Sequence, residues 1–273
     1  MRYIRIAVSV LFIVSLIFIG GVEITERLRL DPNSPVITGP KEPLRISCNY
    51  TEDELLAGLE AHDEEDGDLT DEIMVSNFSR LLEKGTCKVN YVVFDSANQP
   101  ATFSREVIFT DYRSPEFILS KPLVFQKNSN ENIFGNIGAK DILDGDISSL
   151  VRITDSNVNM LEAGNYSVKV EVTNSFGDTV QHILPVHILE IVDSKVVITL
   201  TEGIVYIKAG SAFDPAKYIS GVANTDGTEL DKSIVTYDSS MLNLETPGIY
   251  EVYYTAEQHA TSKGFTALTV IVE

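Results

Sequence analysis

The sequence contains no tryptophan, only four histidines and only two cysteines in 273 residues. Basic residues are also scarce, because 21 Lys and Arg stand against 40 Asp and Glu, which gives a formal net charge of −19 at pH 7. A chain with a large negative net charge is repelled by phosphate backbones and by anionic membrane surfaces, so we exclude nucleic acid as a partner. The acidity is instead typical of a soluble, well-solvated surface.

Known catalytic motifs are missing as well. There is no nucleophile elbow, no His-Glu-x-x-His and no phosphate-cradling glycine loop. Histidine 182 alternates in register with Leu184 and Val186, which favours a packed strand position over a catalytic one. We therefore predict no catalytic residue and no enzyme activity. The histidines are scattered along the chain: His62, His182, His187 and His259.

The longest uncharged run lies at the N-terminus. Arg2 and Arg5 precede it, and residues 6–22 contain no charged side chain. A run of this length is at the short end of the roughly 17–25 residues that cross a bilayer, and the arginines place the N-terminus inside. We predict a single-pass signal anchor at the cell membrane over residues 1–22, a tether over 23–33 and an extracytoplasmic remainder. The alternative is a cleaved signal peptide and secretion.

An acidic turn motif occurs twice in full and once in reduced form. Residues 63–70 are Asp-Glu-Glu-Asp-Gly-Asp-Leu-Thr, residues 141–148 are Asp-Ile-Leu-Asp-Gly-Asp-Ile-Ser, and residues 224–230 are Asn-Thr-Asp-Gly-Thr-Glu-Leu. Glycine tolerates a positive φ, and Asp carboxylates accept hydrogen bonds from nearby backbone N–H groups, so each motif predicts a tight turn. The near-regular spacing predicts three repeats.

Each turn is followed by a segment in which apolar and polar residues alternate, as in a strand with one face on a core. These segments are 85–93, 164–172 and 247–255, and a second predicted strand follows at 103–109, 180–188 and 265–272. The predicted buried faces are Cys87, Val89, Tyr91 and Val93; Tyr166, Val168, Val170 and Val172; and Tyr250, Val252, Tyr254 and Ala256.

Short strands separated by frequent turns, without a convincing long helix, describe β-sandwiches. We therefore predict an all-β fold of three tandem Ig-like β-sandwich domains after an N-terminal transmembrane helix. The first repeat spans residues 34–111, the second repeat 112–190 and the third repeat 191–273.

These motifs resemble a family of bacterial Ig-like surface domains first named from a pesticidal crystal protein. The family pattern is an Asp-x-x-Asp-Gly-Asp-Leu-Thr turn, a Pro-Gly-x-Tyr-x-Val-x-Tyr-x-Val strand and an Asp-x-x-Gly-Asn turn. It is matched at 63–70, at 85–98 and at 164–172, and in the third repeat at Asp226-Gly227 and at 247–250. Two departures stand out: Cys87 replaces the family tyrosine, and the third repeat lacks the second Asp of its turn.

The resemblance implies a non-catalytic, membrane-anchored cell-surface protein that acts as a stalk, an adhesion module or a scaffold. Its implied partner is a protein or glycan of the cell envelope or surface, with the membrane contacted through residues 6–22. Two alternatives stay open: a calcium-rigidified, cadherin-like rod, and an accessory binding subunit for an envelope enzyme or polymer.

The acidic turns also offer hard oxygen ligands of the kind that calcium prefers. We expect these carboxylates to cap backbone N–H groups and predict no cofactor, with calcium binding as the alternative. The candidate ligands are Asp63, Asp66, Asp68, Asp141, Asp144 and Asp146.

The two cysteines lie in the same repeat. Cys48 ends a candidate strand over residues 44–48, and Cys87 takes an inward position in an alternating strand. In an oxidising compartment, with no other cysteine to compete, this pair predicts a Cys48–Cys87 disulfide. The alternative is two separate thiols, with Cys87 packed as a small apolar side chain.

Overall fold

The computed structural model describes residue 15 and residues 34–191, 195–260 and 262–273. Apart from residue 15, the predicted signal anchor (1–22) and tether (23–33) lie outside the described residues. Within the described ranges, no helix is both long enough and apolar enough to cross a membrane. The chain divides into two compact units, residues 1–112 and 113–273, and the second unit holds the second and third repeats.

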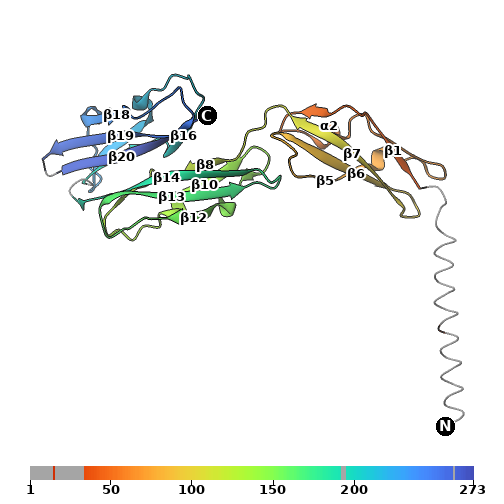
Figure 1. The fold of residues 1–273 in the computed structure, drawn as a ribbon, viewed down its shortest axis with the longest axis horizontal. Helices are drawn as coiled ribbons and strands as arrows, with labels where there is room; N and C mark the ends of the chain where they lie inside the picture. The colour runs from red at the N-terminus through yellow and green to blue at the C-terminus, as the bar shows by residue number, and fades with distance from the viewer. Residues whose placement is uncertain (1–14, 16–33, 192–194, 261) are drawn as a thin grey trace, which may run out of the picture. The chain divides into compact units, whose positions relative to one another are not determined.

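The first repeat consists of two sheets (Figure 1). One sheet has the order β1-β3-β4 and the other the order β2-β7-β6-β5, in which β2 runs parallel to β7 and the other pairs are antiparallel. The strands are β1 (Val36–Thr38), β2 (Leu44–Ile46), β3 (Glu60–Asp63), β4 (Gly67–Asp68), β5 (Met74–Phe78), β6 (Thr86–Phe94) and β7 (Pro100–Phe109).

A short α-helix, α2 (Glu52–Leu56), precedes β3. Thr51 caps its N-terminus in a capping box with Glu54, which satisfies backbone N–H groups that the first turn leaves unpaired. Leu55 is the buried residue of this helix, and the hydroxyl of Tyr91 donates to its carbonyl oxygen at 2.8 Å. This hydrogen bond and the burial of Leu55 attach the helix to the core strand β6.

The second repeat has the same arrangement, with sheets β11-β10-β8 and β12-β13-β14-β9. Strand β9 runs parallel to β14, as β2 does to β7. The strands are β8 (Glu116–Leu119), β9 (Val124–Gln126), β10 (Ile137–Asp141), β11 (Gly145–Asp146), β12 (Arg152–Ser156), β13 (Gly164–Thr173) and β14 (Thr179–Leu189).

The third repeat keeps the four-stranded sheet β16-β20-β19-β18 and has a two-stranded sheet β15-β17. Its reduced turn motif forms no strand equivalent to β4 or β11 among the described residues. The strands are β15 (Val196–Leu200), β16 (Ile204–Ile207), β17 (Ile219–Asn224), β18 (Val235–Asp238), β19 (Gly248–His259) and β20 (Ser262–Val272). The whole described chain is thus all-β with paired sheets, as the sequence predicts.

The cores lie on the predicted faces of β6, β13 and β19. In β6 the four predicted inward side chains are fully buried, and in β13 and β19 only the leading tyrosines, Tyr166 and Tyr250, are partly exposed. Both tyrosine hydroxyls donate to the carbonyl oxygen four residues earlier, at 3.0 Å, so each ring closes the end of its own sandwich.

The predicted Cys48–Cys87 disulfide is not formed: both cysteines are buried, separate thiols. Register gives the reason. Cys87 on β6 pairs with Val107 of β7, whereas the backbone of Cys48 donates to Asp111, four residues beyond Val107. Because β2 and β6 flank β7, the two cysteines are two strand spacings apart, about 10 Å, and are also displaced along the strands, which exceeds the reach of a disulfide.

Candidate functional site

The acidic turn of the second repeat shows how its carboxylates are used. Asp141 ends β10, and its Oδ1 accepts the backbone N–H groups of Leu143 and Asp144 at 2.9 and 3.0 Å. Asp144 reaches the neighbouring loop, where it accepts the N–H and the hydroxyl of Ser175, each at 2.6 Å. The turn therefore clamps the loop between β13 and β14.

The turn of the first repeat makes the matching bonds. Asp63 Oδ1 accepts the N–H groups of Glu65 and Asp66 at 2.8 and 3.0 Å, and Asp66 Oδ2 accepts the N–H of Ser96 at 2.8 Å. Gly67, the first residue of β4, adopts a φ of 79°, which fits the predicted need for glycine.

The last Asp of each full motif accepts the backbone N–H of the first residue of a 3-10 turn. Asp68 Oδ1 accepts the N–H of Thr70, and Asp146 Oδ1 accepts that of Ser148, at 3.0 and 2.9 Å. The hydrogen bonds from Thr70 and Ser148, side chain first and then backbone, lower the pKa of Asp68 and of Asp146. In the third repeat, Asp226 accepts the N–H of Thr228 in the same way.

All six predicted carboxylates lie in these two turns, and each repeat keeps its own set. In the part of the chain that the structure describes, no group of three or more His, Cys, Asp or Glu side chains is arranged to hold a metal ion. Calcium binding by the six carboxylates, the alternative to capping, stays a hypothesis. The geometry itself shows carboxylates accepting backbone N–H groups, as caps do.

A second site is the interface between the second and third repeats. His187 of β14 is 5% exposed although it points away from the core of its own repeat. Its Nε2 lies 2.7 Å from Oε1 of Glu251 on β19, and its Nδ1 lies 2.8 Å from Oδ1 of Asn165. The ring meets Tyr253 and Phe265 edge-on, at centroid distances of 5.8 and 5.4 Å. The imidazole is thus held on every side by residues of two repeats.

Tyr206 of β16 makes a further buried contact across this interface. Its hydroxyl accepts the backbone N–H of Phe117 on β8 at 2.7 Å, and burial raises the pKa of the phenol. The imidazole of His182 packs on Phe117 at 5.4 Å between ring centroids, and burial lowers its pKa. His182 is therefore a packed strand residue, as its register predicts.

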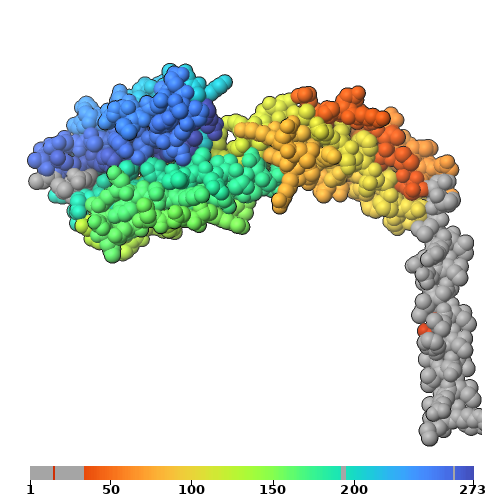
Figure 2. Space-filling model, viewed as in Figure 1, coloured from red at the N-terminus to blue at the C-terminus, as the bar shows by residue number. Residues whose placement is uncertain are grey.

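Apolar contact is continuous between these two repeats. Ile204 and Ile271 of the third repeat belong to the buried cluster that contains Phe117 and Val168 of the second. Gly203 lies so close to the chain after β8 that an added Cβ would meet backbone atoms of residues 121 and 122 at 2.8 and 2.9 Å. The atoms of the two repeats, green and blue in Figure 2, are in direct contact.

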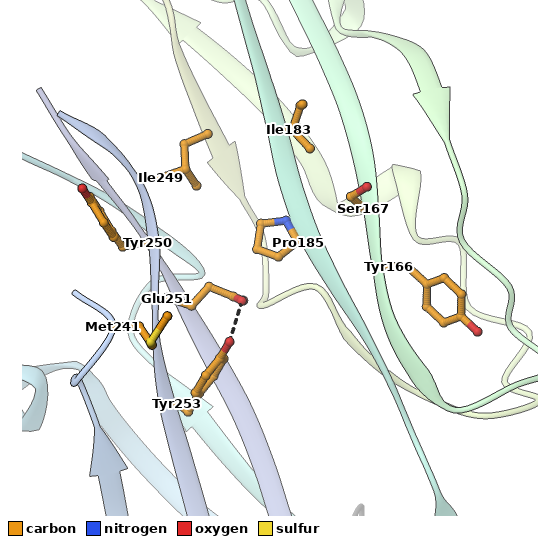
Figure 3. A pocket seen from close by; sticks show the side chains of 9 residues that line it. All are labelled: Tyr166, Ser167, Ile183, Pro185, Met241, Ile249, Tyr250, Glu251 and Tyr253. Atoms are coloured by element: carbon orange, nitrogen blue, oxygen red, sulfur yellow. Dashed lines mark hydrogen bonds between the residues drawn. The ribbon is translucent and has the colours of Figure 1, made fainter. Parts of the chain in front are cut away.

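A groove of about 400 Å³ opens between β14 and β19 (Figure 3). Ile183 and Pro185 of β14 line one side, and Ile249 and Glu251 of β19 line the other, with Met241 at the rim. Ile183 and Met241 are 59% and 72% exposed.

The tyrosines of this groove already have polar partners. Tyr166 and Tyr250 donate to carbonyl oxygens of their own repeats, and Tyr253 donates to Glu251 Oε2 at 3.1 Å. Their hydroxyls are therefore occupied by hydrogen bonds within the protein, and the remaining lining is mainly aliphatic.

Sequence reasoning did not identify His187 as an interface residue. The signal that points to it is the outward face of β14, where Ile183, Pro185 and His187 stand at positions that an exposed strand fills with polar residues. Such a face predicts a covering partner, but only the structure shows that the third repeat is that partner.

No family model matches the chain. It is 29% identical over 144 residues to an uncharacterized 81.3 kDa protein of Acholeplasma phage L2, covering 52% of this chain and 19% of the relative. It is 33% identical over 135 residues to the pesticidal crystal protein Cry22Aa of Bacillus thuringiensis, covering 48% and 18%. The matched part spans less than a fifth of either relative.

Solved structures give weaker likenesses. The CBM51-2 and INT domains from Clostridium perfringens ZmpB match 56% of this chain and 40% of theirs, with a TM-score of 0.28 and 16% identity. The protocadherin GammaB4 extracellular domain matches 88% of this chain and 50% of its own, with a TM-score of 0.20 and 13% identity. The chain is thus similar in sequence to part of a crystal protein and in structure is an all-β chain of paired sheets.

Proposed function

We propose that this protein is a non-catalytic, membrane-anchored cell-surface protein whose repeats form a stalk or scaffold. The observation that carries the proposal is the apolar junction of the second and third repeats, in which Ile204 and Ile271 join the cluster around Phe117. Adjacent domains in one chain move relative to each other unless their interface is large and apolar. An apolar junction of this kind suits an element that transmits position and force without bending there.

The histidines support a role without catalysis. His187 and His182 are both taken up by packing between the second and third repeats, where their neighbours are aromatic rings, an amide and one glutamate. The partner that fits this proposal is a protein or glycan of the cell envelope. The net charge of −19 disfavours strongly anionic polymers.

Protease treatment tests the surface location. Intact cells or spheroplasts that express the full chain are treated with a protease and probed with antibodies against the second and third repeats. We expect digestion of both repeats without lysis, because Arg2 and Arg5 precede the apolar run and favour an external C-terminal bulk. A cytoplasmic protein carried as a control must stay intact. Full protection of the repeats until lysis would contradict the proposal.

A further inference from the structure

Two buried carboxylates of the first repeat each have one oxygen without a hydrogen-bond donor. Asp63 and Asp95 are 2% and 5% exposed. Asp63 Oδ1 accepts two backbone N–H groups and Asp95 Oδ1 accepts one, but Oδ2 of each residue is buried and unpaired among the described residues. Only one other buried side-chain atom in the described ranges shares this condition, Oγ of Ser129.

In the second repeat, a side-chain amide donates to the carboxylate oxygen that is unpaired in the first. Asp141 corresponds to Asp63, and Asn174 corresponds to Asp95, because the Oδ1 atom of each accepts the matching backbone N–H groups. Asn174 Nδ2 then donates to Asp141 Oδ2 at 3.1 Å. By this equivalence, Oδ2 of Asp95 occupies the place of the amide nitrogen and faces Oδ2 of Asp63.

Two facing carboxylate oxygens repel each other unless a positive charge lies between them. Backbone N–H groups already occupy Oδ1 of both residues, so the two Oδ2 atoms are left together as acceptors in a buried place. The local sequence adds negative charge, since residues 63–68 contain five acidic side chains and no basic one. An uncompensated buried charge is costly, so the pair calls for a cation.

We propose that the first repeat binds one hard cation of the calcium type between Asp63 Oδ2 and Asp95 Oδ2. Carboxylate oxygens suit such an ion, and calcium tolerates the irregular geometry that magnesium does not. This site differs from the two sets of three turn carboxylates named as alternative calcium ligands, because it joins the turn to the loop after β6 and has no counterpart in the second repeat. It is also independent of the surface role proposed above. With only two carboxylates, the affinity is weak, with a Kd on the order of 10⁻⁴ to 10⁻³ M.

The test is ion counting on the full chain, purified in detergent and stripped with a chelator. Calcium is titrated in by calorimetry, with magnesium and sodium as comparison ions. We expect one saturable calcium ion per chain for the wild type and none for Asp95→Asn, which copies the second repeat and therefore folds. The reciprocal variant Asn174→Asp rebuilds the pair opposite Asp141, and for it we expect two ions.

Asp68→Asn is the matched control, because this exposed cap lies in the same turn but not in the pair, and it should retain one ion. Absence of saturable calcium binding by the wild type would overturn the proposal. So would an unchanged stoichiometry in Asp95→Asn, which would assign the ion to surface carboxylates. A melting temperature that responds to pH but not to any added ion would identify a shared proton as the occupant and would equally overturn it.

Discussion

The first and second repeats carry the same hairpin with differently composed outer faces. Along β7 the outward residues Ser104, Glu106 and Ile108 correspond to Ile183, Pro185 and His187 of β14, because each pairs with the equivalent residue of β6 or β13. Ser104 and Ile183 are both exposed, but His187 is buried by the third repeat. The comparison shows that the inner face fixes the sandwich, whereas the outer face decides whether a neighbouring repeat can pack on it.

The largest expected effect comes from breaking the polar contact of the packed face. His187→Ala removes a buried ring from the interface and takes one partner from the partly buried Glu251 and one from Asn165. We expect the free energy of unfolding of the second and third repeats to fall by about 3 kcal/mol. Ile108→Ala, at the equivalent position of the first repeat, provides the control and should not affect those two repeats. Denaturant unfolding monitored by hydrogen exchange resolves the repeats, and an equal loss in both variants would contradict the comparison.

The inner faces differ as well, because Cys87 stands where the second repeat has Tyr166. Burial raises the pKa of the Cys87 thiol to about 11 from 9.0. Because the folded-state pKa lies above the unfolded value, the stability that the neutral buried thiol contributes is complete below pH 9 and is lost as the pH rises through about 11. We expect the free energy of unfolding of the first repeat to fall across this window by up to about 2.7 kcal/mol.

Cys87→Ala removes the thiol and provides the control for this alkaline effect. Burial also raises the pKa of Tyr91 to about 12 in the same repeat, so the variant keeps the tyrosine contribution and loses only that of the thiol. Identical pH profiles for the wild type and the variant, measured by urea unfolding between pH 8 and 11, would show that the thiol does not contribute.

Adding a methyl group at the junction tests how tightly the third repeat packs against the second. Gly203→Ala places a Cβ within 3 Å of backbone atoms of residues 121 and 122, which cannot move aside as a flexible side chain does. We expect a loss of about 2 kcal/mol in the unfolding free energy of the second and third repeats. Gly221→Ala, where an added Cβ meets nothing within 4 Å, is the matched control in the same repeat. Equal effects of the two variants would argue against a tight junction.

The smallest effect is expected at the exposed end of the outer face of β14. Ile183 is 59% exposed, so Ile183→Ser, which copies Ser104 of the first repeat, should change the free energy of unfolding by less than about 0.5 kcal/mol. A loss above 1 kcal/mol in thermal unfolding would show that the interface extends along the whole outer face rather than ending near His187.

Much of the fold follows from local sequence. The alternation around Val89, Val168 and Val252 gives the inner faces, and the Asp-Gly turns give the connections, because both depend on residues close together in the chain. What depends on separate segments was harder to predict. The separation of Cys48 from Cys87 depends on strand register, and the burial of His187 depends on a partner surface some 60 residues away.

The candidate sites divide in the same way. The caps made by Asp68 and Asp146 follow from their own turns. The pair Asp63–Asp95 does not, because Asp95 belongs to another loop and only the contrast with Asn174 reveals the unpaired oxygens.

Native-state hydrogen exchange of the full chain tests the central claim most directly, namely that the second and third repeats are one cooperative unit. Because residues of the third repeat are buried in the core cluster of the second, amides of β13, β14, β19 and β20 should exchange through a common opening with one free energy. In His187→Ala, amides of β19 and β20 should exchange before those of β13 and β14. Separate openings of the two repeats in the wild type would contradict the account.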